Sequence, residues 1–346
     1  CDSFLIMSEI KQTRFLILLI GRLNQTMSVS NPPMAKNRKG RDLTGIFLLN
    51  KDKSMSSNYA LQKVKRIFNA KKAGHTGSLD PLATGVLPIC LGEATKFSNF
   101  FLNADKKYQV KLVLGVETDT YDSEGQIVAE SSTKNISKSS IQVALKKFKG
   151  NLRQVPPMFS AIKLKGKPLY KYARQGVSVE RKAREICIYD IKLLSFRQQE
   201  LMEVELFLHV SKGTYIRSFA HDLGECLGSG AHVSALHRTE VGQFTEKSSV
   251  KLVDIEQSEE IGDLKGLENK IFSLESVMRE GFCVDVSNEE GTKFCLGQSV
   301  IIKESFPICA EAYIVRVFNA NGRFLGTGTL DNKRLLSPKR VVCIRE

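Results

Sequence analysis

Two stretches of the chain alternate apolar and polar residues with a period of two, the pattern of a β-strand that buries one face. They are Tyr108 to Val116 and Met202 to Val210. The period arises because successive side chains of a strand point to opposite faces of the sheet. The second stretch runs through residues 211–214 into a helical pattern whose apolar stripe is Ile216, Phe219, Ala220 and Leu223. This predicts an α/β fold with a strand–loop–helix junction at a sheet edge, where functional sites are often built.

A second helix is predicted over residues 58–68. Its apolar residues recur at helical spacing, and Ser57 is the expected N-cap. This helix and the amphipathic segment 93–101 bracket residues 73–88, AGHTGSLDPLATGVLP, which contain three glycines, two prolines and no regular period. A loop held between rigid elements commonly carries function.

Asp80 is the acidic residue of this loop. It precedes Pro81, which disfavours the α conformation at Asp80 and keeps its backbone extended. From the residues alone, two interpretations stay open. Asp80 is a functional carboxylate, or it caps backbone amides in an Asx-type turn.

Positive charge is concentrated in the middle of the chain. Lys and Arg number 51 against 37 Asp and Glu, a net charge of +14, which favours a polyanionic partner such as nucleic acid or an anionic membrane surface. Residues 142–184 hold twelve basic residues and one acid, Glu180. A solvated surface would explain this run, but its length and lack of counter-charge favour contact with phosphates. The longest apolar run, residues 15–20, falls short of the roughly 20 residues that cross a bilayer, so no membrane partner is expected.

Composition divides the chain into an N-terminal extension, a basic arm, a main α/β domain, an acidic helical connector and a small β-barrel, over residues 1–33, 34–41, 42–245, 246–290 and 291–346. We expect the extension to be non-native or disordered, because the chain begins at Cys1 while Met27 and Met34 are later start sites. Residues 251–290 contain eleven acids. Beyond them, short apolar runs alternate with turn signals, as in a small barrel.

Several chemistries are excluded by motifs that this sequence lacks. It has no G-x-x-x-x-G-K-[ST] phosphate cradle, no G-x-S-x-G nucleophile elbow and no H-E-x-x-H zinc motif. Its eight cysteines include no C-x-x-C pair, which argues for thiols in a reducing cytoplasm. His232 and His237 lack companions at metal-ligand spacing, and Asp119, Asp122 and Glu124 predict a turn rather than a Ca²⁺ loop. We therefore expect no metal, no cofactor and a cytoplasmic protein.

Four ordered blocks of the chain resemble the bacterial tRNA pseudouridine-55 synthases, the TruB family. The most specific block is GHTGSLDPLATGVLPICLGEATKF at residues 74–97. The others are DKKYQV at 105–110, PPMFSAIK at 156–163, and SKGTYIR at 211–217 followed by DLGE at 222–225. The resemblance covers roughly residues 41–346, with a weaker, PUA-like match in the C-terminal strands.

The resemblance implies the pseudouridine synthase fold, an α/β (α+β) fold with a mixed, largely antiparallel central sheet and a small C-terminal PUA-like β-barrel. It implies isomerisation of uridine to pseudouridine at position 55 in the T-loop of tRNA, with the target base flipped out of its stack. The partner is then the T-arm of tRNA. No obligate protein partner is evident, and a monomer is expected.

The resemblance also implies roles for individual residues. Asp80 is the nucleophile, since a carboxylate can stabilise or covalently trap the intermediate without metal or cofactor. Arg217 is its ion-pair partner and favours the charged carboxylate. Tyr108, by composition simply a core aromatic, lies against the target base and takes part in proton transfer. The other substrate contacts are His75, Tyr215 and Leu236.

Two departures from the family pattern stand out. The family's K-P-x-G loop reads Lys51-Asp-Lys-Ser54, without Pro or Gly, and Glu180 and Glu185 stand where the family has prolines. Two other functions stay open. The chain could be a tRNA-binding folding helper in which catalysis is secondary, or a nucleotide hydrolase that uses the same carboxylate and lets water finish the reaction.

Overall fold

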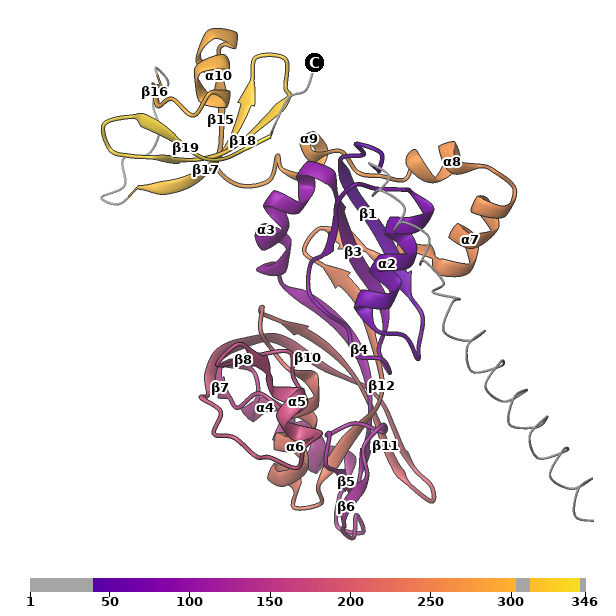
Figure 1. Cartoon of the computed structure of the whole chain (residues 1–346). Coiled ribbons are helices and arrows are strands. Elements are labelled where there is room, and N and C mark those ends of the chain that lie inside the picture. Colours follow the sequence, from indigo (N-terminus) through magenta and orange to yellow (C-terminus); the bar gives the residue numbers. More distant parts are fainter. Residues whose placement is uncertain (1–39, 303–311, 343–346) are drawn as a thin grey trace, which may run out of the picture. The chain divides into compact units, whose positions relative to one another are not determined.

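The described strands form one large mixed sheet and a smaller C-terminal sheet (Figure 1). The computed structural model describes residues 40–302 and 312–342. The expected extension 1–33 and nearly all of the basic arm 34–41 lie outside the described residues. Within the described ranges, no helix is long and apolar enough to cross a membrane.

The large sheet has ten strands, β1 (Gly45–Lys51), β2 (Ala73–His75), β3 (Thr84–Leu91), β4 (Lys106–Leu114), β7 (Gly150–Gln154), β10 (Arg184–Gln198), β11 (Met202–Val210), β12 (Ala231–Val241), β13 (Phe244–Thr245) and β14 (Val250–Lys251). Their order is β14-β1-β3-β12-β4-β11-β10-β7, with β2 paired to β3 and β13 to β12. The pairs β1–β14 and β3–β12 are parallel, and the other described pairs are antiparallel. The expected mixed, largely antiparallel sheet is confirmed.

Two short hairpins project from this framework. They are β5 (Val116–Thr118) with β6 (Ile127–Glu130), and β8 (Lys163–Leu164) with β9 (Lys167–Pro168). The first follows directly on the end of β4, and the turn between its strands carries Asp122.

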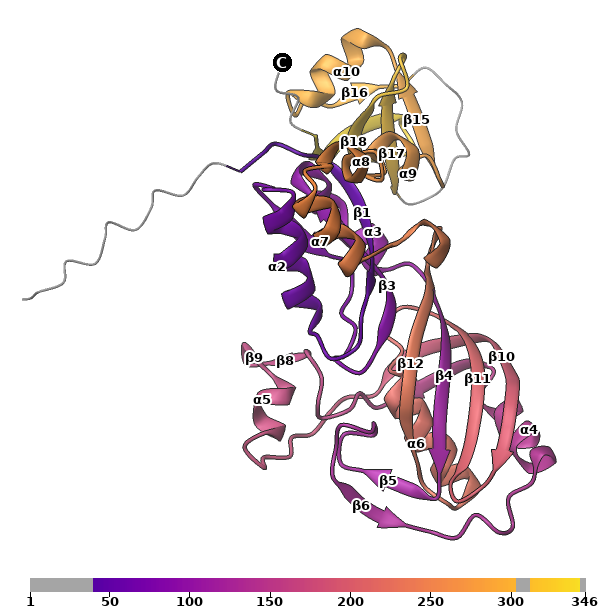
Figure 2. The same ribbon diagram turned by 90° about the vertical axis from the view of Figure 1, so that its right-hand side faces the viewer.

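Helices from several parts of the chain contribute to the main core on the large sheet. The helices are α2 (Ser57–Ile67), η1 (Gly92–Phe97), α3 (Ser98–Leu102), α4 (Lys138–Lys147), α5 (Leu169–Ala173), α6 (Ile216–Leu227), η2 (Glu246–Ser248), α7 (Leu252–Glu260), α8 (Leu264–Glu268), α9 (Leu274–Val277) and α10 (Asn288–Cys295). Val64 of α2, Leu145 of α4 and Phe219 of α6 share one buried cluster with β4 and β11. Figure 2 shows α4 and α6 on the same side of strands β4, β11 and β10.

The burial of the strands explains which of them alternate in sequence. β4 and β11 pair antiparallel in unbroken register, and their apolar residues share the face that α6 covers. In β1, by contrast, Phe47 and Leu49 enter the main core while Ile46 and Leu48 enter a second cluster with residues of η1, α3 and α9. A strand buried on both faces reads as a continuous apolar run, so it shows no alternation.

The N-cap of α2 is Ser56, not Ser57 as the sequence predicts. The Ser56 hydroxyl accepts a hydrogen bond from the Tyr59 amide at 3.1 Å. Ser57 is buried, and its hydroxyl bonds both backbone groups of Leu79, accepting from the N–H at 2.7 Å and donating to the carbonyl at 2.9 Å. Adjacent serines are equally good caps, so a partner far along the chain decides between them.

The C-terminal sheet contains five strands in the order β15-β17-β18-β19-β16 and curls over its own core (Figure 1). They are β15 (Cys283–Val286), β16 (Val300–Ile301), β17 (Tyr313–Asn319), β18 (Phe324–Leu330) and β19 (Leu335–Val341). β15 lies before the expected domain start at residue 291. The last strand begins at Leu335, although its segment LLSPKRV shows no alternation of apolar and polar residues.

Candidate active site

The loop that carries Asp80 is fixed on both sides of that residue. The Ser57 hydroxyl holds both backbone groups of Leu79, and the Ser54 amide donates to the Pro81 carbonyl at 2.8 Å. The Ala83 amide donates to the Asp80 carbonyl at 3.0 Å and closes a turn. The backbone of Asp80 therefore has little freedom to move.

Ser54 stands where the family loop has glycine, and its backbone is left-handed, with φ 67°. Glycine adopts this conformation freely, whereas another residue loses on the order of 1–2 kcal/mol. Serine thus keeps the geometry that the bond to Pro81 needs, at a cost in stability. Lys51 of the same loop is buried, and its ammonium donates to the Asp52 and Met55 carbonyls, each at 2.8 Å.

Arg217 brings helix α6 to this loop. Its side chain is 5% exposed, and its Nε lies 2.9 Å from Asp80 Oδ2 and 3.5 Å from Asp122 Oδ2. The two terminal nitrogens donate to backbone carbonyls, Nη1 to Thr120 at 3.2 Å and Nη2 to Phe159 at 2.8 Å. The guanidinium is therefore held by contacts on every nitrogen, so it presents a fixed charge to Asp80.

Asp122 is a member of this cluster that the sequence did not indicate. It lies in the predicted turn after β5, where its Oδ1 accepts hydrogen bonds from the Glu124 amide at 3.0 Å and the Thr120 hydroxyl at 2.7 Å. Its other oxygen faces Arg217, and its side chain is 4% exposed. A buried carboxylate needs a partner, but only the fold shows that the turn lies beside α6.

Opposing effects act on the Asp80 carboxyl. Burial raises its pKa, the Arg217 guanidinium lowers it and the Asp122 carboxylate raises it, so that the pKa lies above its ordinary value. The side chain is 38% exposed, which leaves it accessible to a substrate. Among the described residues, no backbone amide donates to this carboxylate. The Asx-turn interpretation of Asp80 is therefore not supported.

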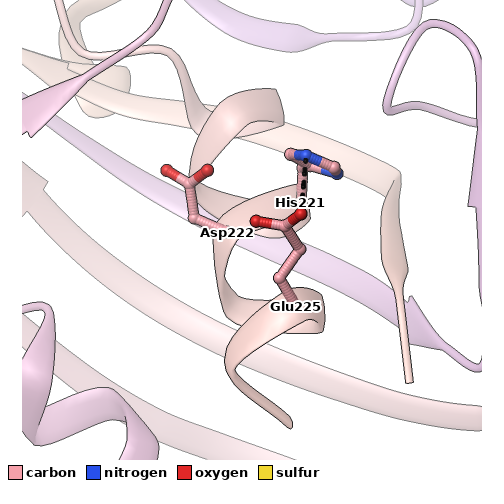
Figure 3. A group of neighbouring side chains, drawn as sticks. All are labelled: His221, Asp222 and Glu225. Carbon is pink, nitrogen blue, oxygen red and sulfur yellow. Dashed lines mark ion pairs between the residues drawn. The ribbon is translucent and has the colours of Figure 1, made fainter. Parts of the chain in front are cut away.

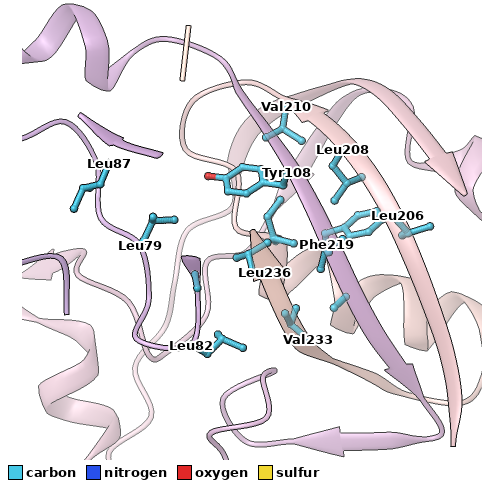
Figure 4. Close-up of a cluster of buried hydrophobic side chains, with 14 of the residues drawn as sticks. Leu79, Leu82, Leu87, Tyr108, Leu206, Leu208, Val210, Phe219, Val233 and Leu236 are labelled. Carbon is cyan, nitrogen blue, oxygen red and sulfur yellow. The ribbon is translucent and has the colours of Figure 1, made fainter. Parts of the chain in front are cut away.

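Asp80 and Arg217 line a cavity of about 530 Å³, and Tyr108, Tyr215 and Leu236 line it as well. Figure 4 shows Tyr108 beside Leu236, with its hydroxyl extended toward the side where Leu79 lies. A volume of this order suits a ligand the size of one nucleotide. The fold thus brings five of the six residues that the family resemblance singles out to one cavity.

His75 is the sixth, and it does not line that cavity. It ends β2 and pairs with Ile89 of β3. Its side chain is half-buried, and burial together with the nearby Arg238 charge lowers its pKa. Any contact that His75 makes with a substrate therefore lies outside the pocket of Asp80.

One turn beyond Arg217, α6 carries three neighbouring ionisable side chains, His221, Asp222 and Glu225 (Figure 3). One nitrogen or oxygen atom of each lies within 4.8 Å of the others. The His221 Nδ1 is 2.9 Å from a Glu117 carboxylate oxygen, and the ring stacks on Tyr121 at a centroid distance of 4.1 Å. Because Glu117 lies in β5 and Tyr121 lies in the turn that carries Asp122, these contacts connect that turn to α6.

Three family models match consecutive segments of this chain. They describe the N-terminal domain of TruB family pseudouridylate synthase, over residues 65–216, the tRNA pseudouridylate synthase B C-terminal domain, over 217–279, and the C-terminal part of pseudouridine synthase II TruB, over 283–342.

Curated relatives match along almost their whole length. The chain is 45% identical over 307 residues to tRNA pseudouridine synthase B of Actinobacillus pleuropneumoniae, covering 89% of this chain and 98% of that protein. It is 46% identical over 310 residues to the protein of that name from Mannheimia succiniciproducens, covering 89% and 99%. A solved structure of an H/ACA ribonucleoprotein bound to a substrate RNA containing 2′-deoxyuridine has a TM-score of 0.66 at 22% identity, covering 88% of this chain and 86% of that chain. That likeness shows a shared fold.

Proposed function

Because this chain belongs to the TruB family of pseudouridylate synthases, and is thereby an isomerase of uridine, we propose that its target is the uridine at position 55 in the T-loop of tRNA. The relatives named above are tRNA pseudouridine synthases. In the reaction, the N1–C1′ bond breaks, the base rotates and a C5–C1′ bond forms. The C5 hydrogen leaves to water and N1 gains a proton, so the mass of the RNA does not change.

One observation carries the assignment of roles: the Asp80 carboxylate lies 2.9 Å from Arg217 Nε on the wall of a cavity that also has Tyr108 in its lining. In our proposal Asp80 is the nucleophile and holds the intermediate while the base turns. Arg217 favours the ionised carboxylate. Tyr108 packs against the base and takes part in the proton transfer.

The target base enters the cavity flipped out of its stack. A stacked base cannot reach a carboxylate in a cavity wall, and extrusion costs a few kcal/mol. Contact with an aromatic face returns about 1–3 kcal/mol. We assign Tyr215 and Leu236 to the walls of this base pocket, and His75 to the RNA outside it.

Two other parts of the chain are proposed to hold the RNA backbone. Ten of the twelve basic residues in the segment 142–184 are exposed, so their charges are available to phosphates. The second part is the C-terminal sheet, the core of the proposed RNA-binding domain 291–346, to which β15 adds a strand. Both would recognise charge and shape rather than base identity.

The proposal is tested by incubating the purified protein with T-arm RNA and mapping pseudouridine chemically at each position. Pseudouridine is expected at the T-loop uridine, at unchanged RNA mass. Modification at another uridine would contradict the proposed target. Loss of the base, detected as a lower mass, would support the nucleotide hydrolase instead.

The pH dependence of the reaction should reflect the raised pKa of Asp80. The reactive form is the carboxylate, so activity is lost as the pH falls through that pKa. The acid limb is therefore expected above the ordinary value for aspartate, about 3.9. Single-turnover rates measured as a function of pH give its position.

Asp122→Asn is the matched variant for this prediction. The Asp122 carboxylate raises the pKa of Asp80, and the variant also leaves Arg217 to pair with Asp80 alone. Its acid limb is therefore expected at lower pH than that of the unaltered protein. An acid limb that moves upward would show that the charge of Asp122 does not act on Asp80 in this way.

A further inference from the structure

Two cations lie buried in the lining of the cavity that holds Asp80. Lys106 is 8% exposed and Arg238 is 1% exposed. In the part of the chain that the structure describes, neither forms an ion pair with a carboxylate. An unpaired buried charge is costly, so cations at these two positions point to a ligand that supplies the negative charge.

The pairing of β4 and β12 fixes where these cations lie relative to the base pocket. Arg238 lies directly opposite Tyr108, so their side chains share a face of the sheet. Lys106 and Leu236 each precede one of these residues by two positions and therefore lie on that face too. Two residues of a strand span roughly 6.6 Å, a step comparable to that from a nucleobase to its phosphate.

The protein uses only part of the hydrogen-bonding capacity of each cation. The Lys106 ammonium donates to the Leu102 carbonyl at 2.7 Å and the Ala104 carbonyl at 2.6 Å, two bonds for three N–H groups. The Arg238 guanidinium donates from Nε to the Val86 carbonyl at 2.8 Å and from Nη2 to the Gly77 carbonyl at 3.5 Å. A guanidinium has five N–H groups, so these two bonds leave several of its donors unused. These bonds hold both cations in place, and the remaining N–H groups are available to an anion.

We propose that Lys106 and Arg238 bind a phosphodiester that flanks the target uridine, while Tyr108 and Leu236 contact its base. This subsite rests on the proposed function. Asp80 and Arg217 line the same cavity, but there Arg217 pairs with both Asp80 and Asp122. One cation for two anions disfavours a phosphate beside them. A cationic pair for the backbone and an anionic cluster for the reacting sugar would give the flipped nucleotide a single orientation.

The electrostatics of Lys106 agree with this arrangement. Burial, and then the neighbouring Arg238 charge, lower its pKa to about 8. A phosphate bound between the two cations would offset both effects, because it replaces lost hydration and screens their mutual repulsion. Bound RNA should therefore keep Lys106 charged.

Lys106 is the better residue to vary. Arg238 bonds Val86 and Gly77, which lie on either side of Asp80 in the chain, so its removal would also disturb the catalytic loop. Lys106 bonds carbonyls at and just beyond the end of α3. Its neighbour Lys107 points to the other face of β4 and pairs with Glu240 at 2.7 Å, which makes Lys107→Met a matched control.

The test combines Lys106→Met with T-arm RNA in which one phosphate beside the target uridine is a neutral methylphosphonate, on the 5′ side in one RNA and on the 3′ side in another. Lys106→Met is expected to weaken binding of unmodified RNA roughly 10- to 100-fold, the range for a lost charged hydrogen bond. The methylphosphonate on the contacted side should weaken binding by the unaltered protein similarly. The two changes together should then weaken binding little more than either alone, because both remove one contact.

The outcomes separate the subsite from the function. For the control Lys107→Met, the effect of the variant on affinity and the effect of the modified phosphate should be independent, so that the two fold-losses multiply. If the fold-losses also multiply for Lys106→Met with both modified RNAs, the subsite is overturned. The subsite is also overturned if the unaltered protein binds both modified RNAs as tightly as the unmodified RNA. Pseudouridine in the unmodified RNA is measured in the same samples. If no pseudouridine forms, the proposed function fails. If pseudouridine forms but the fold-losses in affinity multiply, only the subsite is overturned.

Discussion

Asp80→Asn is expected to slow pseudouridine formation on the order of 10⁴-fold or more, as the loss of a nucleophile does in other enzymes. The amide has nearly the same shape as the carboxylate but cannot act as an anionic nucleophile. Arg217 retains Asp122 as a partner at 3.5 Å, so the fold and RNA binding should change little. Release of tritium from tRNA labelled at C5 of uridine measures the rate, and equilibrium binding of the same RNA measures affinity.

Asp52→Asn is the matched control, because Asp52 is an exposed acid in the neighbouring loop. It should keep the full rate of tritium release. A substantial rate in Asp80→Asn would rule out Asp80 as the nucleophile. Rescue of a deletion strain by the inactive Asn variant would instead show that the folding-helper role is the one that growth requires.

Arg217→Met is expected to reduce both stability and activity. It leaves the Asp122 carboxylate 4% exposed and without its cation, and breaking a buried pair in this way costs about 3–5 kcal/mol. The lower end applies, because Asp80 is 38% exposed. Without the guanidinium the pKa of Asp80 also rises further, so less of the carboxylate is ionised at neutral pH. We expect kcat/KM to fall about 10²- to 10³-fold, as on removal of one charge-stabilising donor.

Arg217→Lys separates charge from geometry. Lysine keeps the positive charge but cannot bridge two carboxylates and two carbonyls, as the planar guanidinium does. We expect it to recover most of the free energy of unfolding, measured by urea titration, and little of the activity. Equal recovery of both quantities would mean that charge alone accounts for the role of Arg217.

Periodicity was sufficient to predict the framework of the fold. β11 has the predicted bounds, β4 is displaced by two residues, and the whole apolar stripe of α6 is buried. These elements bury one face, so their apolar residues recur with the period of a strand or a helix and can be recognised in the sequence. β1 and β3 are buried on both faces, and β15 is a short strand that completes a sheet formed by later residues. Their positions depend on partners that no local pattern specifies.

The candidate site was predictable where it follows a specific motif, and not where it depends on proximity in the fold. The family resemblance singled out Asp80 and Arg217. Asp122 reads as an ordinary turn residue until the turn is seen beside α6, and Ser57 reads as a cap until Leu79 is found against it. Arg238 gave no signal, because only strand register shows that it lies opposite Tyr108.

The guanidinium shared between two acids bears on the whole turnover. If Asp80 forms an ester with the sugar, its carboxyl becomes neutral. Were Asp80 the only anion beside Arg217, the guanidinium would then be a buried cation without a partner. The second acid, Asp122, whose Oδ2 is 3.5 Å from the same nitrogen Nε, compensates that cation for as long as the adduct lasts. Asp122 would thus let the site pass between its free and glycosylated forms without repacking, and would spare the intermediate an electrostatic penalty.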